Sequence, residues 1–119
     1  MSKFFAHVSR VKYIERWSLK RNSRPENVQE HSWEVAVIVH LLAMLRNTYF
    51  QGQVDANKLV VAAIYHDVHE VVTGDLATPV KNFSPQIRDS YKQLESYACD
   101  LLIDSLPEEL QQELTWPIR

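Results

Sequence analysis

Residues 55–74, DANKLVVAAIYHDVHEVVTG, are the stretch that decides the fold. Asp55 is a suitable N-cap, because its side chain can accept a hydrogen bond from a free backbone amide in the first turn of a helix. The apolar side chains that follow recur at helical spacing: Leu59, Val60, Ala63, Ile64 and Val68. Gly74 stands where the end of a helix favours a left-handed residue. The stretch therefore predicts a helix from Ala56 to about Val72.

Two further helices are predicted on the N-terminal side of this stretch. Apolar residues at helical spacing predict an amphipathic helix from residue 4 to about Trp17. Asn27 and Glu30 resemble a capping box, with Asn in place of the usual Ser or Thr, and predict the start of a long helix that runs to about Arg46. Residues 35–45 are apolar on nearly every side of that helix, so we expect it to be central and buried.

Two more helices are predicted on the C-terminal side. After a loop over residues 75–83, Ser84-Pro85 supplies the cap and first residue of a fourth helix, and Pro107 opens a short fifth helix over residues 108–114. The chain has only two glycines and five prolines, too few for a turn-rich β-sandwich or barrel. We therefore expect an all-α fold of about five helices, with residues 1–119 in one domain.

Charge and composition narrow the class of protein. A formal net charge of -2 gives no overall basic footprint for a nucleic-acid polymer. The longest apolar run, residues 35–45, is too short to span a membrane, and residues 1–7 lack the apolar segment of a signal peptide. Because Cys99 has no second cysteine to pair with, a reducing compartment is favoured, and we expect a cytoplasmic protein without a membrane partner.

Four ionisable residues fall within residues 66–70, HDVHE, near the end of an apolar helix. A histidine and an aspartate side by side are common ligands of divalent transition ions. His31, in the first turn of the long helix, is the natural third ligand if the two helices pack antiparallel or crossed. A lone histidine is more often structural, but the set of His31, His66 and Asp67 predicts a metal site.

Three residues nearby are candidates for proton transfer or phosphate binding. Glu70 lies four residues after His66, on the same helix face, where it can hold a metal-bound water or take its proton. A solvated glutamate at a helix end is an equally good interpretation. Asp75 can donate or accept a proton, and is otherwise a turn residue. Thr78 can offer its hydroxyl to a phosphate oxygen, and is otherwise an ordinary loop threonine.

The other three histidines stay outside the predicted ligand set. His7 lies on a basic helix, and His40 lies in an apolar run where a neutral, hydrogen-bonded histidine is common. His69 lies three residues after His66, where it can hydrogen-bond to a metal ligand without binding the ion itself.

The N-terminal region is strongly basic. Seven of the thirteen Lys and Arg residues precede Pro25: Lys3, Arg10, Lys12, Arg16, Lys20, Arg21 and Arg24. They form either a solvated helix face or a positive rim that faces an anion. The guanidinium of Arg16 can clamp a phosphate, and the indole of Trp17 offers a flat surface to a sugar or base. Together with the metal candidates, this pair favours a phosphorylated substrate.

These motifs together resemble a known family. The order His31, then His66-Asp67, is similar to the H…HD signature of the HD-domain metal-dependent phosphohydrolases. A longer series of segments resembles the YfbR-type 5'-deoxynucleotidases: Phe4-Phe5-Ala6-His7, Arg16-Trp17, Glu26-Asn27-Val28, Glu30-His31-Ser32, Tyr65-His66-Asp67, Glu70, Thr73-Gly74-Asp75-Leu76 and Thr78-Pro79-Val80-Lys81. The resemblance runs to about Leu110 and implies an HD-domain helical bundle.

The resemblance also implies an activity. Such enzymes hydrolyse deoxyribonucleoside 5'-monophosphates to the deoxynucleoside and phosphate, use a divalent ion such as cobalt or manganese, and form homodimers. The implied ligands of the ion are three residues: His31, His66 and Asp67. Glu70 would position or activate the attacking water, Asp75 would help to transfer a proton, and Arg16 would orient the phosphate. The residues implied to bind the substrate are Arg16, Trp17, Asp67, Asp75, Leu76, Ala77 and Thr78, with Trp17 against the sugar.

The family pattern ends on an aspartate of a later helix, and relatives run considerably longer. The aspartates on or near the predicted fourth helix, Asp89, Asp100 and Asp104, do not stand in a matching context. We therefore expect residues 1–119 to be the N-terminal part of an HD domain. Two alternatives stay open: a module that binds nucleotide or a partner chain without turnover, and an HD phosphohydrolase of another nucleotide. Arg16-Trp17 and the Asp75 loop favour the deoxynucleotidase over the second alternative.

Overall fold

The computed structural model describes residues 3–16, 25–76 and 78–119. Its elements are α1 (Phe4–Val8), the 3-10 helix η1 (Ser9–Tyr13), α2 (Val28–Tyr49), α3 (Ala56–Tyr65), α4 (Glu70–Thr73), α5 (Thr78–Lys81), α6 (Pro85–Asp104) and α7 (Glu108–Ile118). Within these ranges the extended pairing is one isolated bridge, between Glu15 and Asn27. The all-α prediction is confirmed, although several of the five predicted helices are divided or displaced.

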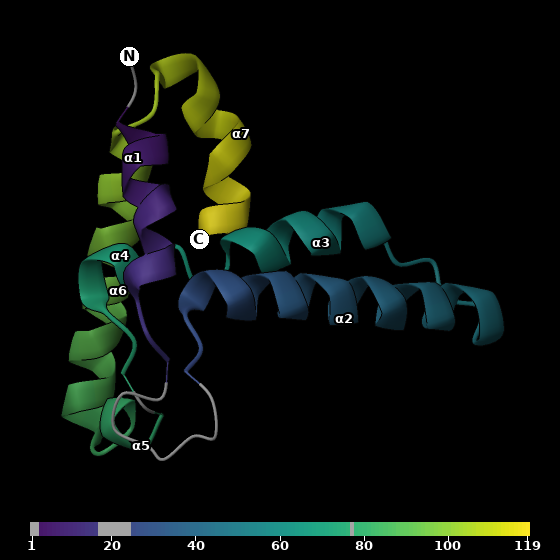
Figure 1. The fold of residues 1–119 in the computed structure, drawn as a ribbon, viewed down its shortest axis with the longest axis horizontal. Coiled ribbons are helices and arrows are strands. Elements are labelled where there is room, and N and C mark those ends of the chain that lie inside the picture. Colours follow the sequence, from purple (N-terminus) through teal and green to yellow (C-terminus); the bar gives the residue numbers. More distant parts are fainter. Residues whose placement is uncertain (1–2, 17–24, 77) are drawn as a thin grey trace.

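The helices form two groups (Figure 1). α6 runs the length of the first group, with α1 and α4 beside it, while α2 and α3 lie side by side and point away from it. The core lies where α6, α7 and the turn after α3 meet. Its buried residues are Val68, Cys99, Leu102, Ile103 and Ile118. Phe4 and Val8 of α1 pack against this core. Val68 thereby anchors the turn after α3 and fixes the residues on either side of it.

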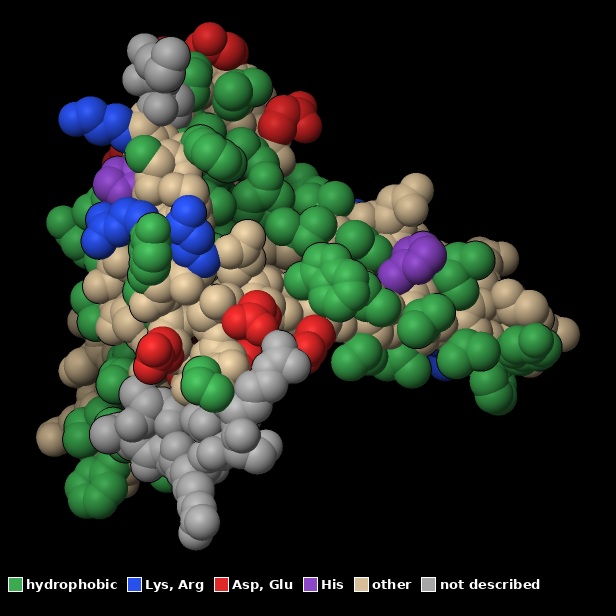
Figure 2. Space-filling model, viewed as in Figure 1, with side chains coloured by type: hydrophobic (Ala, Val, Ile, Leu, Met, Phe, Trp, Pro, Cys, Tyr) green, Lys and Arg blue, Asp and Glu red, His purple; other side chains and the backbone are tan. Residues whose placement is uncertain are grey.

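α2 is not the buried helix that its composition predicts. Its buried residues are Val28, Ala36 and Ala43. Large apolar side chains stay exposed along it: Trp33, Val37, Ile38, Leu41, Leu42, Met44 and Leu45. The prediction is wrong because α2 packs mainly along α3, which covers one side of it. Figure 2 shows the resulting apolar surface on this α2–α3 arm, which also carries an apolar groove of about 610 Å³.

The N-terminal segment is helical over less of its length than expected. α1 tightens into η1, and Ile14 is already extended. From there the backbone pairs with the residues before α2: the amide of Arg16 donates to the carbonyl of Glu26 (2.7 Å), and that of Val28 donates to the carbonyl of Ile14 (2.8 Å). Since this pairing satisfies backbone groups that a longer helix would have used, it holds Arg16 beside the start of α2. Trp17, Lys20, Arg21 and Arg24 lie outside the described residues.

The helix predicted over residues 56–72 ends at Tyr65 instead. Residues 66–69 form a turn in which the amide of Val68 donates to the carbonyl of Tyr65 (3.2 Å), a tight i to i+3 bond. Burial of Val68 explains the change of direction, because α4 then lies beside α6 rather than on the line of α3 (Figure 1). Gly74 ends α4 with a φ of 73°, the positive value predicted for it.

The remaining boundaries differ from the prediction by a few residues. α2 continues to Tyr49, α7 continues to Ile118, and α5 forms inside the predicted loop. The three side-chain caps are confirmed: Asn27 accepts from the amide of Glu30 (2.8 Å), Asp55 from that of Lys58 (3.0 Å) and Ser84 from that of Ile87 (3.1 Å). No helix in the described ranges combines the length and apolarity needed to cross a membrane.

Candidate functional site

The three predicted metal ligands lie together where α2 begins and α3 ends. His31, His66 and Asp67 each offer one ligand atom, and these atoms all lie within 4.8 Å of one another. Asp67 Oδ2 is 2.9 Å from His66 Nε2 and 3.7 Å from His31 Nε2. The three residues come together because α2 and α3 pack side by side, which places the first turn of α2 beside the last turn of α3.

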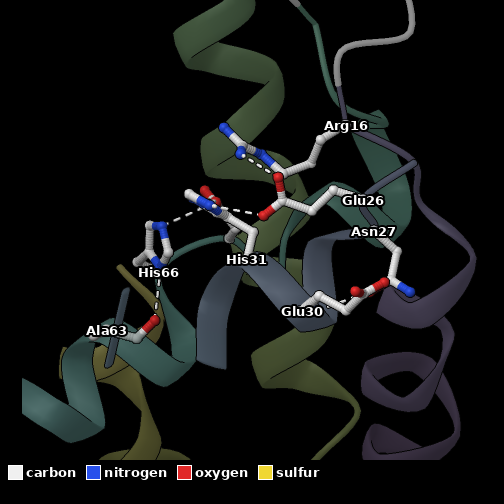
Figure 3. A network of polar contacts seen from close by, with 8 residues as sticks. Arg16, Glu26, Asn27, Glu30, His31, Ala63 and His66 are labelled. Atoms are coloured by element: carbon white, nitrogen blue, oxygen red, sulfur yellow. Dashed lines mark hydrogen bonds and ion pairs between the residues drawn. The ribbon is translucent and has the colours of Figure 1, made fainter. Parts of the chain in front are cut away.

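The surroundings of these residues decide how readily each of them can bind a cation. His66 Nδ1 is 2.6 Å from the carbonyl of Ala63, so Nδ1 carries the hydrogen and Nε2 faces the site (Figure 3). Burial, followed by the charge of Arg16, lowers the pKa of His31 and favours its neutral form. Burial alone would raise the pKa of Asp67, but the hydrogen bond from His66 and the nearby histidines lower it overall, so this carboxylate is ionised.

This donor set fits a divalent transition ion. Two imidazoles and one carboxylate are ligands that zinc, cobalt and manganese all accept. A neutral histidine and an ionised aspartate are also the protonation states that metal binding requires. By contrast, the hydrogen bond with Asp67 raises the pKa of His66, so a cation would have to compete with a proton there. Metal affinity should therefore improve as the pH rises.

Glu26 links the metal candidates to Arg16. Its Oε2 lies 3.4 Å from Arg16 Nη1, and its Oε1 lies 3.7 Å from His31 Nδ1 (Figure 3). The side chain is largely buried, with 24% of its surface exposed. Sequence reasoning gave Glu26 no role. Glu26 directly precedes Asn27, the cap of the helix that carries His31. That position in the sequence could have indicated that its side chain lies near His31.

Glu70 is the most deeply buried carboxylate of the site. The residue is 3% exposed, and its Oε2 has no hydrogen-bond partner among the described residues. Burial, followed by the negative charges of Asp67 and Asp75, raises the pKa of Glu70 to about 8. The positive charges of Lys81 and Arg16 act in the opposite direction. Glu70 therefore belongs to the same electrostatic cluster as the predicted ligands, and it is not a solvated residue.

His69 belongs to the same turn and contacts α6. It is 7% exposed, and its Nε2 is 3.3 Å from Glu95 Oε2 of α6. Burial is the main reason that the pKa of His69 is lowered. No sequence signal points to Glu95, because the contact depends on how α6 packs against the turn.

The other predicted site residues are less closely tied to this cluster. Asp75 and Leu76 are half-buried after Gly74, and Thr78 is exposed at the start of α5. Trp17 and Ala77 lie outside the described residues. Lys81, which sequence reasoning left without a role, is close enough to influence the pKa of both His69 and Glu70.

Comparison with known sequences gives consistent results. The sequence matches the family model described as 5'-deoxynucleotidase YfbR-like over residues 3–118. A 5'-deoxynucleotidase of Yersinia pestis (strain Pestoides F) is 50% identical over 113 residues, which are 95% of this chain and 57% of the relative. A 5'-deoxynucleotidase of Yersinia pseudotuberculosis serotype O:3 (strain YPIII) matches to the same extent. The chain thus spans a little over half the length of these curated relatives.

Solved structures share the arrangement of helices. An HD-domain phosphohydrolase from Listeria innocua superposes with a TM-score of 0.83 at 24% identity, covering 98% of this chain and 56% of that protein. A predicted metal-dependent phosphohydrolase from Magnetospirillum magnetotacticum MS-1 gives a TM-score of 0.71 at 26% identity, covering 98% of this chain and 55% of that one. Matched over nearly its whole length, the protein has the HD-domain fold and belongs to the YfbR-like 5'-deoxynucleotidase family.

Proposed function

We propose that the protein is a metal-dependent 5'-deoxynucleotidase that hydrolyses deoxyribonucleoside 5'-monophosphates to deoxynucleosides and phosphate. The observation that carries this proposal is the convergence of His31, His66 and Asp67 on one point, with buried Glu70 in the same cluster. The names of the family and of its Yersinia relatives support the choice of substrate. The preferred ion in this proposal is cobalt or manganese.

The three ligands would hold one divalent ion, which lowers the pKa of a bound water and draws charge from the phosphoryl oxygens. Arg16 would bind and orient the phosphate, and its guanidinium would stabilise the charge that develops there. Glu26 would hold Arg16 in place. Trp17 would lie against the sugar and crowd a 2'-hydroxyl, and the pocket would be completed by Asp75, Leu76, Ala77 and Thr78.

Glu70 and Asp75 would divide the proton transfers. Hydrolysis forms a bond from the water oxygen to phosphorus and breaks the bond from phosphorus to the 5'-oxygen of the sugar. Glu70 would take the proton that the water gives up, and Asp75 would help to supply the proton that the leaving 5'-oxygen needs. A carboxyl with a pKa near 8 is a strong base once it is ionised, because the buried charge favours recapture of a proton.

We further propose that the protein forms a homodimer in the cytoplasm. Exposed apolar surface on the α2–α3 arm supports self-association, since large patches of this kind mark interaction sites. Cys99 is a free, buried thiol, which agrees with a reducing compartment.

Phosphate release tests the proposed activity directly. With added cobalt or manganese, the 119-residue chain should release phosphate from a deoxyribonucleoside 5'-monophosphate and not from its ribose counterpart. Equal release from both would contradict the role of Trp17 at the sugar. Release from neither would favour a module that binds nucleotide without turnover.

Two variants separate metal binding from phosphate binding. His66→Ala should abolish both bound metal and phosphate release, because it removes a ligand of the ion. Arg16→Ala should lower turnover by about 100-fold or more while the ion stays bound, as expected for loss of one stabilising donor. His40→Ala, on the exposed side of α2, is the matched histidine control and should change neither. Metal loss in Arg16→Ala would contradict the phosphate role.

The raised pKa of Glu70 predicts a pH-dependent stability. In metal-free protein the folded state keeps the Glu70 proton that the unfolded state releases near pH 4.5, so the free energy of unfolding should fall as the pH rises from 4.5 to about 8. The slope from this group is at most about 1.4 kcal/mol per pH unit. Glu70→Gln should remove that slope in urea titrations with chelator, whereas Glu34→Gln at an exposed site on α2 should keep it. An unchanged slope in Glu70→Gln would show that Glu70 is ionised in the folded protein.

The dimer is tested by sedimentation at several concentrations. Leu41→Glu places a charge in the groove of the α2–α3 arm and should shift the protein to monomer. Leu110→Glu adds the same charge at an exposed position of α7 and should leave the dimer intact. A monomer at every concentration would contradict the proposed dimer. A dimer that persists in Leu41→Glu would contradict the groove of the α2–α3 arm as its interface.

A further inference from the structure

Two buried side-chain atoms among the described residues make no hydrogen bond, and they lie on two helices that pack together. One is Glu70 Oε2 at the start of α4, and the other is the hydroxyl oxygen of Tyr91 on α6. The two residues are 3% and 7% exposed. An unpaired buried polar atom is costly, and native proteins seldom keep one unless a water or a function accounts for it. Two such atoms on neighbouring helices call for a common explanation.

The two atoms have complementary chemistry. Burial is the main reason that the pKa of Tyr91 is raised, and the charge of Glu70 adds to the rise. The phenol is therefore protonated at neutral pH and can donate a hydrogen, whereas a carboxylate oxygen accepts one. The electrostatic influence of Glu70 on Tyr91 also places the two side chains near each other. Tyr91 is thus a buried donor without an acceptor, and Glu70 is a nearby acceptor without a donor.

Thr73 supplies a third polar group at the same place. It is one of the neighbours that act on the phenol of Tyr91, and it donates its own hydroxyl hydrogen to the carbonyl of Gly74 (2.9 Å). Thr73 Oγ1 can therefore still accept a hydrogen bond. A buried water needs about two to four polar partners, and a water bridges polar groups that are too far apart for direct contact. One water can accept from Tyr91 and donate to both Glu70 and Thr73.

Lys81 joins the same group from α5. Its Nζ lies 5.1 Å from the centroid of the Tyr91 ring, a distance typical of a cation–π contact. Burial raises the pKa of Glu70, and the positive charge of Lys81 is the strongest influence in the opposite direction. The contact with Lys81 holds the ring of Tyr91 in place and leaves its hydroxyl to the water.

We propose that Tyr91 is a positioning residue for Glu70, whose Oε2 it reaches through one buried water that Thr73 also binds. This inference rests on the proposed function, in which Glu70 takes a proton from the attacking water. A carboxylate that is held at Oε2 cannot rotate freely, so its Oε1 stays directed at the attacking water. The same hydrogen bond favours the ionised carboxylate, which is the form that acts as a base. Tyr91 acts on the reaction only through Glu70.

A double-mutant cycle on stability tests this link without reference to turnover. Tyr91→Phe removes the hydroxyl alone, and Glu70→Met removes the carboxylate and keeps an unbranched side chain. Each variant and the double variant are unfolded in urea with chelator present. Their effects on the equilibrium constant for unfolding should be non-additive by about fivefold, as expected for one hydrogen-bonded link. Effects that add to within about twofold overturn the proposal.

Kinetics of the metal-loaded protein then test the positioning role. Tyr91→Phe should lower kcat about tenfold with KM and bound metal unchanged, because it disturbs the base and not the binding of substrate. Tyr97→Phe is the matched control on α6, where Tyr97 is 61% exposed, and it should change neither kcat nor stability. An unchanged kcat in Tyr91→Phe contradicts the positioning role.

Thr73→Val provides a second cycle with Tyr91→Phe if Glu70→Met does not fold. It keeps the shape of the side chain and removes the third partner of the water, so the same non-additivity is expected, and additive effects again overturn the proposal. Phosphate release by the wild-type chain keeps the two claims distinguishable. Non-additivity without release supports the link and contradicts the proposed function, whereas release with additive effects leaves the proposed function standing and removes the link.

Discussion

The tight turn at residues 66–69 is the constraint on which the rest of the site depends. Because Val68 is buried in the core against α6 and α7, α3 stops at Tyr65 and the backbone turns at residues 66–69. Asp67 then reaches His31 at the start of α2, while His69 and Glu70 are buried towards α6. A helix continued straight through this stretch would have spread the same side chains around its axis.

The site concentrates ionisable groups where burial is costly. Glu70 and His69 are almost fully buried, and Asp67 lies between two histidines. The histidines beside Asp67 favour its charged form, but lost hydration disfavours a charge on Glu70 or on His69. Ionising Glu70 without a cation nearby would therefore oppose folding. Proteins commonly accept such a penalty at functional sites, and the surrounding core supplies the stability that holds the groups together.

Extended backbone, and not a helix, positions Arg16 at the site. The short backbone pairing between residues 14–16 and 26–28 holds it at the start of α2. The carboxylate of Glu26 then lies between the guanidinium of Arg16 and the ring of His31. A shift of this segment would therefore move the side chains of Arg16 and His31 together.

The sequence by itself determined the helical class, the caps at Asn27, Asp55 and Ser84, and the three predicted metal ligands that the fold brings together. These are local signals, since a cap lies within one turn of its helix and the HD pair is adjacent in the chain. Tertiary structure alone decided that α3 ends at Tyr65, that α2 leaves a broad apolar face exposed, and that Glu26 and Glu95 contact His31 and His69. Hydrophobic periodicity shows which residues are apolar, but which of them are buried depends on the helices that pack beside them.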